Sequence, residues 1–529
     1  MPGVSLPLYS FAEVQRCDQE TQAAGIDATQ LMGRAAQASY TLLSRSWYEN
    51  SKQRPLPHEI VCLCGPGNNG GDGYALAWLL RSDPLLANIP IRVYSNGTPR
   101  TTAARHYFDL LKSIGMPIDT AERFYMEYSF SRPTWLIDAL LGVGLQGRVR
   151  GFVAEIIQQI NAARKTTNAL YCISLDLPSG LSEDYETGPD ADNSSYLVSD
   201  EIHSYGLPKL ANYWPWQKWR CEHIHELAIG FHPASLPAHQ FQTCQTSLEA
   251  SVFKKKAWHH KYAAGAGILI GGSRGMTGAM LLAARSFFAS GGGLLHAFVA
   301  DSDAQGALQA QLPEVMWHPL TDLQSFPARQ KQNYCIAAGM GLSDIDREEH
   351  QETILQFLRS QGSRSCACIW DAGCLHKPFL ERIRQAHDSA YHLLTPHQGE
   401  WQGLGGSLPA SAQKLEQAVQ YCKKQLPGFD CLIKGTYSVS ISADQAVQQL
   451  YINSCPGLAV AGSGDILDGI LLALGSRSLY TSLPKSEFGW TELVTQALAL
   501  HQQAASASLH PGASQIIGHL NSILDVPDR

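Results

Sequence analysis

The chain has 529 residues, of which 44% are hydrophobic and 16% are charged, and its formal net charge is -7. A single hydrophobic core rarely grows beyond about 250–300 residues, so this length predicts two large domains. The negative net charge argues against a general nucleic-acid or anionic-membrane surface, and no segment has the ~20 unbroken apolar residues of a membrane span.

The first half of the chain alternates between predicted strands and helices. Val14–Ser44 has apolar residues at helical spacing, Ile60–Cys64 is a short apolar run, and Gly73–Leu80 is a predicted helix. Further strands are predicted at Ile91–Tyr94, Trp135–Leu141 and Ala169–Leu177. Strand, glycine loop and helix in repeated order are typical of a doubly wound parallel sheet, so we expect a Rossmann-like αβα domain.

A nine-residue glycine-rich run, Gly65–Gly73, lies between the first of these strands and its helix. Glycines at this point allow positive φ and bring backbone N–H groups close to a phosphate, and the helix N-terminus favours negative charge. A tight turn without ligand is the alternative. The paired Asn68 and Asn69, followed by Asp72, make the run more specific than glycines alone.

Two further strand ends are expected at the same edge of the sheet. Asp138 precedes the loop Gly142–Arg148, and Asp176 is followed closely by Ser179. Ligands of open α/β sheets bind outside the carboxyl ends of the strands, so the three loops should converge. Their Asn, Asp and Ser oxygens suit a hard monovalent cation or a polar substrate rather than a transition metal. Asp176 is a candidate general acid/base, with capping of the next turn as the alternative.

The alternation dissolves at about 233–248 into Pro, Ser, His and Gln, and the basic run Lys254–Lys256 follows. We interpret this stretch as the junction between domains and the basic run as a solvated edge. Beyond it strands are predicted at Gly267–Gly271, Leu294–Val299, Tyr334–Ala338, Cys366–Asp371, His392–Thr395 and Cys431–Lys434. Helices are predicted at Gly278–Ala289, Ser463–Leu474 and Glu492–Ala507. The halves share no motif, which indicates a fusion rather than a duplication.

Small-residue loops in the second half mark a second site, at Gly271–Ser273, Thr277–Ala279, Gly339–Gly341, Thr395–Glu400, Lys434–Thr436 and Ala461–Asp465. In the last loop, exposed N–H groups at a helix start favour a transferring phosphoryl group, and Asp465 can accept a proton from a substrate hydroxyl. A plain helix N-terminus is the alternative. His397 is either a substrate contact or a structural residue, and Glu400 either orders an Mg²⁺-bound phosphate or caps a helix.

The cysteines and the N-terminal segment predict a cytoplasmic protein. The 13 cysteines are odd in number, and none forms a CxxC pair. We expect them to be reduced packing residues in a reducing compartment. The first residues lack the basic and apolar regions of a secretory signal.

From about residue 10 to 235 the chain resembles the NAD(P)H-hydrate epimerase domain of the YjeF N-terminal type, through GPGNNGGDGYALAWLL, IDALLGVGLQGRVRG and SLDLPSGL. Gly206–Lys209 matches a late Pro-Lys motif, and the LANYWPWQKW that follows departs from the family. The resemblance implies K⁺ ligation by Asn69, Asp138 and Ser179. It implies substrate contacts at Asn68, Asn69, Gly70, Gly71, Asp72, Gly142, Val143, Gly144, Leu145, Gln146, Gly147, Arg148 and Asp176.

From about Lys254 to Leu520 the chain resembles the ADP/ATP-dependent NAD(P)H-hydrate dehydratase, which has a ribokinase-like fold. The resemblance implies contacts with the hydrated cofactor at Ala279, Gly341, His397 and Asp465. It implies contacts with the adenine nucleotide at Lys434, Gly435, Thr436, Tyr437, Ser438 and Gly464. The sequence departs from the family's usual residues at Met276, Gly373, Gln398, Val460 and Ala461.

Together the two resemblances imply one repair unit for NADHX and NADPHX, in which water has added across the nicotinamide ring. An epimerase over 1–235 would interconvert the R and S epimers with K⁺ and Asp176. A dehydratase over 250–529 would use ADP or ATP with Mg²⁺ and the base Asp465. We expect these small molecules as the partners of a homo-oligomer, with no nucleic acid or membrane. The alternatives are a small-alcohol kinase in the second half and a nucleotide sensor or scaffold in the first.

Overall fold

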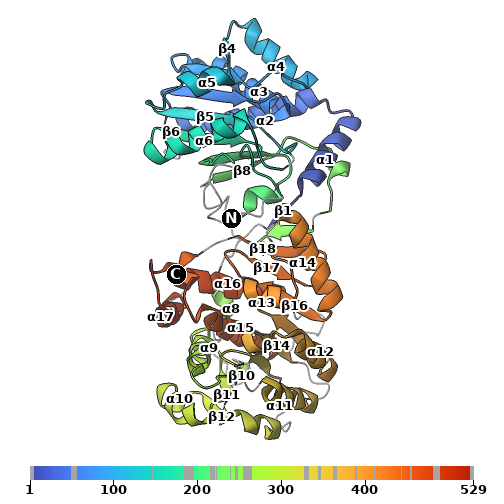
Figure 1. Cartoon of the computed structure of the whole chain (residues 1–529), viewed down its shortest axis with the longest axis vertical. Coiled ribbons are helices and arrows are strands. Elements are labelled where there is room, and N and C mark those ends of the chain that lie inside the picture. The colour runs from blue at the N-terminus through green and yellow to red at the C-terminus, as the bar shows by residue number, and fades with distance from the viewer. Residues whose placement is uncertain are drawn as a thin grey trace. The chain divides into compact units, whose positions relative to one another are not determined.

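The computed structural model describes residues 5–48, 56–145, 147–183, 196–214, 221, 223–238, 240–244, 248–253, 265–326, 333–343, 347–361, 366–387, 390–409, 411–442, 444–452, 455–480 and 489–524. The chain divides into two compact units, an N-terminal one of Leu6–Phe241 and a C-terminal one made mainly of Gln242–Pro409 and Lys414–Arg529 (Figure 1). The basic run Lys254–Lys256 lies outside the described residues.

The N-terminal unit is built on a parallel sheet of seven strands in the order β4-β3-β2-β5-β6-β7-β8. These strands are β2 (Glu59–Cys64), β3 (Ile91–Ser95), β4 (Ile118–Thr120), β5 (Thr134–Ala139), β6 (Leu170–Leu175), β7 (Glu201–Tyr205) and β8 (His223–Leu227). A short strand β1 (Leu6–Leu8) precedes them, and the helices are α1 (Phe11–Ala23), α2 (Ala28–Tyr48), α3 (Asn68–Ser82), α4 (Thr102–Ser113), α5 (Ala121–Glu127) and α6 (Phe152–Thr166).

Helices cover both faces of this sheet. Apolar side chains of α2, α3 and α4 form one core with Ile60 and Cys62 of β2, whereas those of α5 and α6 form another with Val61 and Leu63. Alternate residues of β2 therefore enter opposite cores, which is why the strand reads as an unbroken apolar run. The predicted doubly wound α/β class is confirmed for this unit.

Two of the differences between the N-terminal unit and the sequence prediction have a clear physical reason. The helical pattern Val14–Ser44 is interrupted, because Gly25 takes a φ of 101° and turns the chain between α1 and α2. Strands β7 and β8 were not predicted, since polar residues conceal them. Glu201 and His203 of β7 are fully buried, and His203 Nε2 lies 3.0 Å from Glu201 Oε1, so a polar pair takes the place of an apolar pattern.

The C-terminal unit has a larger mixed sheet, in which β12, β11, β10, β13, β14, β15 and β16 are parallel neighbours and β17 and β18 continue antiparallel. Its strands are β9 (Phe241–Thr243), β10 (Ala266–Gly271), β11 (Leu294–Val299), β12 (Met316–Pro319), β13 (Cys335–Ala338), β14 (Ala367–Trp370), β15 (Tyr391–Leu394), β16 (Phe429–Ile433), β17 (Ser438–Ile441) and β18 (Gln448–Tyr451). The antiparallel continuation was not predicted.

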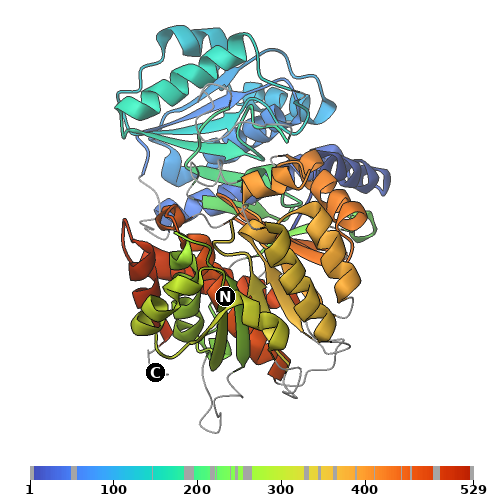
Figure 2. The ribbon, with the colours of Figure 1, turned by 60° about the horizontal axis from the view of Figure 1, so that its bottom comes forward.

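The helices of this unit also lie on both faces of the sheet. They are α8 (Ala250–Phe253), α9 (Thr277–Ala289), α10 (Gln305–Gln311), α11 (Arg347–Ser360), α12 (Lys377–Ala386), α13 (Gln398–Gly403), α14 (Ala412–Gln425), α15 (Ser463–Tyr480), α16 (Trp490–Ser506) and α17 (Ala513–Leu524). One core joins α9, α15, α16 and α17 to one face, and α11, α12 and α14 lie on the other (Figure 2). The predicted α/β class is confirmed here as well.

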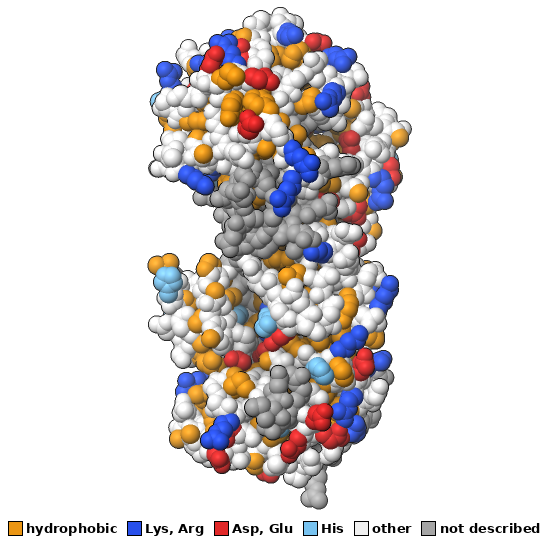
Figure 3. Space-filling view, in the orientation of Figure 1, with side chains coloured by type: hydrophobic (Ala, Val, Ile, Leu, Met, Phe, Trp, Pro, Cys, Tyr) orange, Lys and Arg blue, Asp and Glu red, His pale blue; other side chains and the backbone are white. Residues whose placement is uncertain are grey.

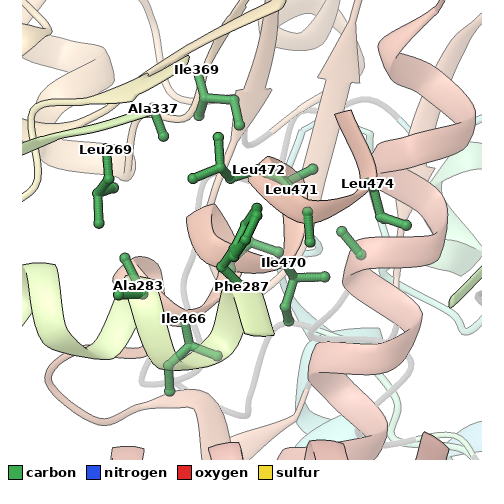
Figure 4. Packing of buried hydrophobic residues seen from close by; sticks show 14 of the residues in the cluster. Leu269, Ala283, Phe287, Ala337, Ile369, Ile466, Ile470, Leu471, Leu472 and Leu474 are labelled. Atoms are coloured by element: carbon green, nitrogen blue, oxygen red, sulfur yellow. The ribbon is translucent and has the colours of Figure 1, made fainter. Parts of the chain in front are cut away.

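Helix α15 lies at the centre of the C-terminal core. Its side chains Ile466 and Ile470 face Ala283 and Phe287 of α9, and Leu472 lies toward Leu269, Ala337 and Ile369 of the sheet (Figure 4). A Cβ on Gly469 would lie 1.9 Å from Ser286 Oγ of α9, so the two helices approach closely only because this residue is glycine. The packing fixes the position of the first turn of α15.

The charged surface residues and the cysteines lie where the composition of the chain predicts them. Basic and acidic side chains are interspersed on the face shown in Figure 3. All 13 cysteines are free thiols, and all but Cys455 are buried, as expected. Among the described residues, no helix is long and apolar enough to cross a membrane.

Candidate functional sites

A cavity of about 610 Å³ lies at the carboxyl ends of the N-terminal strands, between the loops that follow β2, β5 and β6 and the helices α1 and α2. The three loops therefore converge as predicted. The predicted contacts that line the cavity are Asn68, Asn69, Asp72, Gly142, Val143, Gly144, Leu145 and Asp176. The predicted contacts outside its lining are Gly70, Gly71, Gly147 and Arg148, and Gln146 lies outside the described residues.

Two glycines of the first loop are required by backbone packing. A Cβ on Gly70 would lie 1.8 Å from the carbonyl oxygen of Gly65, and one on Gly65 would lie 1.8 Å from that of Leu140. Helix α3 then begins with Gly67 as its N-cap, and no side chain caps its first turn. The N–H groups of that turn are therefore available to an anionic ligand at the cavity.

Asp176 occupies a constrained position directly after β6. Its φ is 67°, a left-handed value that costs a non-glycine residue on the order of 1–3 kcal/mol. The carboxylate Oδ1 lies 2.7 Å from Nζ of Lys209, whose side chain is fully buried. The backbone N–H of Tyr205 points at the same oxygen from 3.3 Å. The surroundings thus hold Asp176 as an oriented, ion-paired carboxylate facing the cavity.

Two further carboxyls share this cavity. Burial raises the pKa of Asp72 well above its usual value, and the negative charges of Asp176 and Asp18 add to that rise. Burial, with a contribution from Asp176, also raises the pKa of Asp18, which α1 contributes to the cavity wall. The site therefore combines a carboxyl paired with Lys209 and a carboxyl whose pKa is raised by burial. Such opposed environments are typical of an acid/base pair.

Asn69, Asp138 and Ser179 lie in one buried cluster next to the cavity. The Asn69 side chain donates from Nδ2 to the Leu141 carbonyl at 2.7 Å, which leaves its buried Oδ1 without a hydrogen-bond donor. Asp138 is fully buried and accepts the Ser179 hydroxyl and the Ser179 N–H. An unsatisfied amide oxygen beside a buried carboxylate is an arrangement that a bound cation would complete.

In the C-terminal unit, an ion pair joins the ends of two parallel strands. Asp371 follows β14, and its Oδ1 lies 2.9 Å from Nζ of Lys434, which follows β16. Although burial acts to raise it, Lys434 holds the pKa of Asp371 below its usual value, and the pair in turn raises the pKa of Lys434. A Cβ on Gly464 would lie 3.4 Å from the same Nζ, so the first turn of α15 touches this pair.

The carboxyl of Asp465 lies in the first turn of α15 and is half-buried. Burial raises its pKa to about 6, and the negative charge of Asp371 adds to the rise while Lys434 opposes it. A carboxylate with a pKa near 6 is ionised at neutral pH and still basic enough to accept a proton from a hydroxyl. Gly462, with a φ of 87°, supplies the turn that leads into this helix.

His397 and Glu400 form the N-terminal cap of α13. His397 Nδ1 accepts the N–H groups of Gly399 and Glu400 at 3.0 and 3.1 Å, and Glu400 Oε2 accepts the His397 N–H at 2.8 Å. Both side chains therefore cap the helix, which is the structural alternative given for each of them. The other ring nitrogen of His397 lies 3.4 Å from Glu400 Oε1 on an exposed side chain, where a ligand can still reach it.

The other predicted contacts of the second site are distributed over several loops. Ala279 lies in the first turns of α9, and Gly341 follows β13. Lys434, Gly435 and Thr436 form the connection between β16 and β17, which begins at Ser438. Tyr437 is buried and donates its hydroxyl hydrogen to the Pro409 carbonyl, so this side chain serves packing.

Several residues of the two sites were not predicted as site residues from the sequence. They are Asp18 of α1, Lys209 as the partner of Asp176, Asp371 as the partner of Lys434, and Asp468 of α15. The spacing of Asp465 and Asp468 was a usable signal, since residues three apart share a helix face. The ion pairs join residues far apart in the sequence and left no local pattern.

Both units match known families. A model of the YjeF-related protein N-terminus matches residues 28–211, and a model described as NAD(P)H-hydrate dehydratase matches residues 267–518. The chain is 26% identical over 430 residues to a bifunctional NAD(P)H-hydrate repair enzyme Nnr of Methanopyrus kandleri, covering 80% of each chain. It is 27% identical over 493 residues to an enzyme of the same name from Vibrio cholerae, covering 90% of each chain.

Solved structures resemble single units of the chain. An ADP/ATP-dependent NAD(P)H-hydrate dehydratase from Bacillus subtilis, co-crystallised with ATP and Mg²⁺, is 24% identical with a TM-score of 0.40, and the match covers 51% of this chain and 94% of that one. The yeast protein YNL200c is 20% identical with a TM-score of 0.35, and the match covers 41% of this chain and 88% of that one.

Proposed function

Since a YjeF-related N-terminal domain is followed by an NAD(P)H-hydrate dehydratase domain, the chain belongs to the bifunctional NAD(P)H-hydrate repair enzymes, and we propose that it returns hydrated nicotinamide cofactors to NAD(P)H in two steps. The first step, in a domain over 1–235, interconverts the R and S epimers of NADHX and NADPHX. The second step, in a domain over 250–529, dehydrates the S epimer at the expense of ADP or ATP.

The pairing of Asp176 with Lys209 at the cavity carries the proposal for the first step. Epimerisation requires the hydroxyl to leave the hydrated carbon as water, with electrons supplied by the ring nitrogen, and water to return on the other face. Asp72, whose pKa is raised by burial, would donate a proton to the leaving hydroxyl. Asp176 would accept a proton from the returning water, because its charge is held by Lys209.

We propose that K⁺ binds beside this cavity. The buried Oδ1 of Asn69 has no donor, and the fully buried Asp138 has no cationic partner within ion-pair distance among the described residues. These residues fit a monovalent cation held by oxygen, with Ser179 as the third ligand. When bound, K⁺ would neutralise Asp138 and fix the loop that carries Asn69.

For the second step we propose that Asp465 is the base. A hydroxide is a poor leaving group, so the ring hydroxyl is first phosphorylated and then leaves as phosphate, pushed out by the ring nitrogen. Asp465 would take the hydroxyl proton, and the N–H groups at the start of α15 would stabilise the transferring charge. Lys434 would bind the phosphates, and Mg²⁺ would screen their charge and enter with the nucleotide.

A four-part incubation tests the proposal. Mixed R and S NADHX is followed by the absorbance of reduced nicotinamide, with and without ADP, for the native chain and for Asp176→Asn. We expect complete recovery with ADP for the native chain, and recovery that slows sharply after the S fraction for the variant. Recovery without any nucleotide would contradict the phosphorylation step, and release of a stable phosphorylated product would favour the small-alcohol kinase.

The localisation and assembly of the chain stay predictions. Its thiols are all free, which supports a reducing compartment such as the cytoplasm. A sensor or scaffold role for the N-terminal unit would require NADPHX binding without turnover.

A further inference from the structure

Asp468 is a buried carboxyl to which the proposed chemistry gives no role. It lies on α15 one turn beyond Asp465, and its side chain is fully buried. Its Oδ1 accepts a hydrogen bond from Thr395 Oγ1 at 3.2 Å. Its Oδ2 is buried as well, and no donor faces it in the described structure. An ionised carboxylate buried with an empty acceptor is expensive, so this group needs either a counter-ion or a proton.

The charges around Asp468 do not supply a counter-ion of its own. Lys434 is the cation that acts on it, and that ammonium is 2.9 Å from Asp371. His501 of α16 contributes none, because burial and Lys434 lower its pKa to about 3. Asp465, and more remotely Glu400, add negative charge to the cluster. One lysine thus faces more carboxyls than it can balance, and at least one of them must be neutral.

We propose that Asp468 is a positioning residue, a neutral carboxylic acid that donates its Oδ2 hydrogen to Asp371 and thereby fixes Asp371 on Lys434. The hydrogen converts the unsatisfied oxygen into a donor, and the Asp371 carboxylate then accepts hydrogen bonds from Asp468 and Lys434 together. Lys434 is held beside Gly464, where the phosphates of the nucleotide would arrive. This role rests on the proposed dehydratase function.

The ionisation behaviour of the cluster supports this assignment. Burial raises the pKa of Asp468 well above its usual value, and the charge of Asp371 adds to the rise. In Asp371, the attraction of Lys434 and the hydrogen bond to Asp468 outweigh burial and keep the pKa low. Asp465, with a pKa of about 6, is the carboxyl left to ionise at neutral pH. The three carboxyls then differ in ionisation: Asp468 is neutral, Asp371 is ionised and Asp465 ionises near pH 6. Such behaviour is typical of coupled carboxyls that share one proton.

The kinetic test compares Asp468→Asn with Asp468→Leu in the full-length chain. Asparagine can donate from its amide to Asp371 and accept from Thr395, as the neutral acid does, whereas leucine of similar size cannot. We expect the asparagine variant to keep dehydratase kcat and the KM for ADP within about threefold. We expect the leucine variant to raise that KM by about tenfold or more, since Lys434 loses its alignment.

Asp465→Asn is the matched control, because it makes the same carboxyl-to-amide change one turn away, at a carboxyl that the proposed chemistry needs in its ionised form. An Asp468→Asn variant as inactive as this control would overturn the proposal, since it would show that Asp468 must be ionised. An Asp468→Leu variant that folds and has the native KM for ADP would overturn it too, because no positioning would then be needed.

A readout independent of activity is the unfolding temperature of the C-terminal unit as a function of pH. A raised folded-state pKa means that the native chain loses stability as pH rises above about 4, the usual value for an unfolded aspartate. Asparagine does not titrate, so the Tm of Asp468→Asn should exceed the native Tm by an amount that vanishes near pH 4 and grows as the pH rises above it.

Infrared difference spectra of the two proteins should also show a protonated-carboxyl C=O band that only the native chain has at neutral pH. A Tm difference that shrinks or reverses as pH rises, or the absence of that band, would show that Asp468 is ionised and would overturn the proposal. Because both readouts work on a chain without dehydratase activity, a failure of the proposed function is distinguishable from a failure of this assignment.

Discussion

In each unit a lysine at the carboxyl edge of the sheet pairs with an aspartate, and the two lysines bind different kinds of carboxylate. In the N-terminal unit Lys209 pairs with Asp176, the candidate acid/base itself. In the C-terminal unit Lys434 pairs with Asp371, and the candidate base Asp465 is left outside the ion pair with a pKa of about 6. We propose that the lysine orients the reacting carboxylate in the N-terminal unit, and orients the residues that face the nucleotide phosphates in the C-terminal unit.

The largest effect is expected from Asp465→Asn. Loss of the base should lower the ADP-dependent dehydration of S-NADHX by about 100-fold or more and leave epimerisation unchanged. The measurement is the initial rate of absorbance recovery, with epimer ratios followed by chromatography. Dehydration at the native rate would show that Asp465 only complements the dipole of α15.

Asp176→Asn is expected to impair epimerisation and to leave dehydration intact, the reverse of Asp465→Asn. Epimerisation should fall by about 100-fold, because the amide can neither accept a proton nor bind Lys209 as an ion, and dehydration of pure S-NADHX should persist. Circular dichroism and the unfolding temperature of the variant control for folding. Full epimerisation by a folded variant would remove the acid/base role from Asp176.

The pH profiles should separate the two sites further. Dehydratase kcat should rise with pH through about 6, because Asp465 must lose its proton to act as a base. The proposed role of Asp72 as proton donor requires its protonated form, and burial raises its pKa, so epimerase activity should persist at acidic pH and decline toward alkaline pH. Both half-reactions are measured on one preparation. An epimerase activity that rises with pH in parallel with the dehydratase activity would contradict the assignment of Asp72 as the proton donor.

The glycine loops of the two sites differ in how much space they leave for a side chain at Gly70 and at Gly464. Gly70→Ala would place a Cβ 1.8 Å from the Gly65 carbonyl oxygen, and we expect it to destabilise the N-terminal unit by about 1–3 kcal/mol. Gly464→Ala places its Cβ 3.4 Å from the flexible end of Lys434 and should leave stability nearly unchanged while weakening ADP binding. Chemical denaturation checks both variants. Equal stability losses would remove this difference between the loops.

The smallest effect is expected from the monovalent cation. Replacing K⁺ by Li⁺ should lower epimerase activity severalfold and leave the ADP-dependent step of pure S-NADHX less affected, because Asn69 and Asp138 lie in the N-terminal unit. Asn69→Ala should remove the cation response. An epimerase that is insensitive to K⁺ in the native chain would argue against the site.

Prediction from the sequence succeeded where the residues of a site lie close together in one short segment of the chain. The unbroken apolar run of β2 and the loop after it predicted the sheet edge, and the three loops of the first site converge as expected. Asp465 was identified because it opens an apolar helix after small residues. In each case one short segment contains both the structural and the chemical signal.

The partners of these residues could not be predicted, because they come from distant segments. Lys209 binds Asp176 across 33 positions and Lys434 binds Asp371 across 63, and no periodicity links such pairs. Strands β7, β17 and β18 were not predicted either, because buried polar side chains such as Glu201, Ser440 and Gln448 interrupt their apolar pattern. Long-range charge pairing is therefore the part of the site that only the fold reveals.

Complementation on pure R-NADHX with ADP shows whether one chain contains two independent and consecutive sites. Asp176→Asn and Asp465→Asn should each fail to restore the absorbance of reduced nicotinamide at the native rate. An equimolar mixture should restore it, because the S epimer made by one variant is consumed by the other. A mixture as inactive as the separate variants, or rapid recovery with either variant alone, would contradict the account.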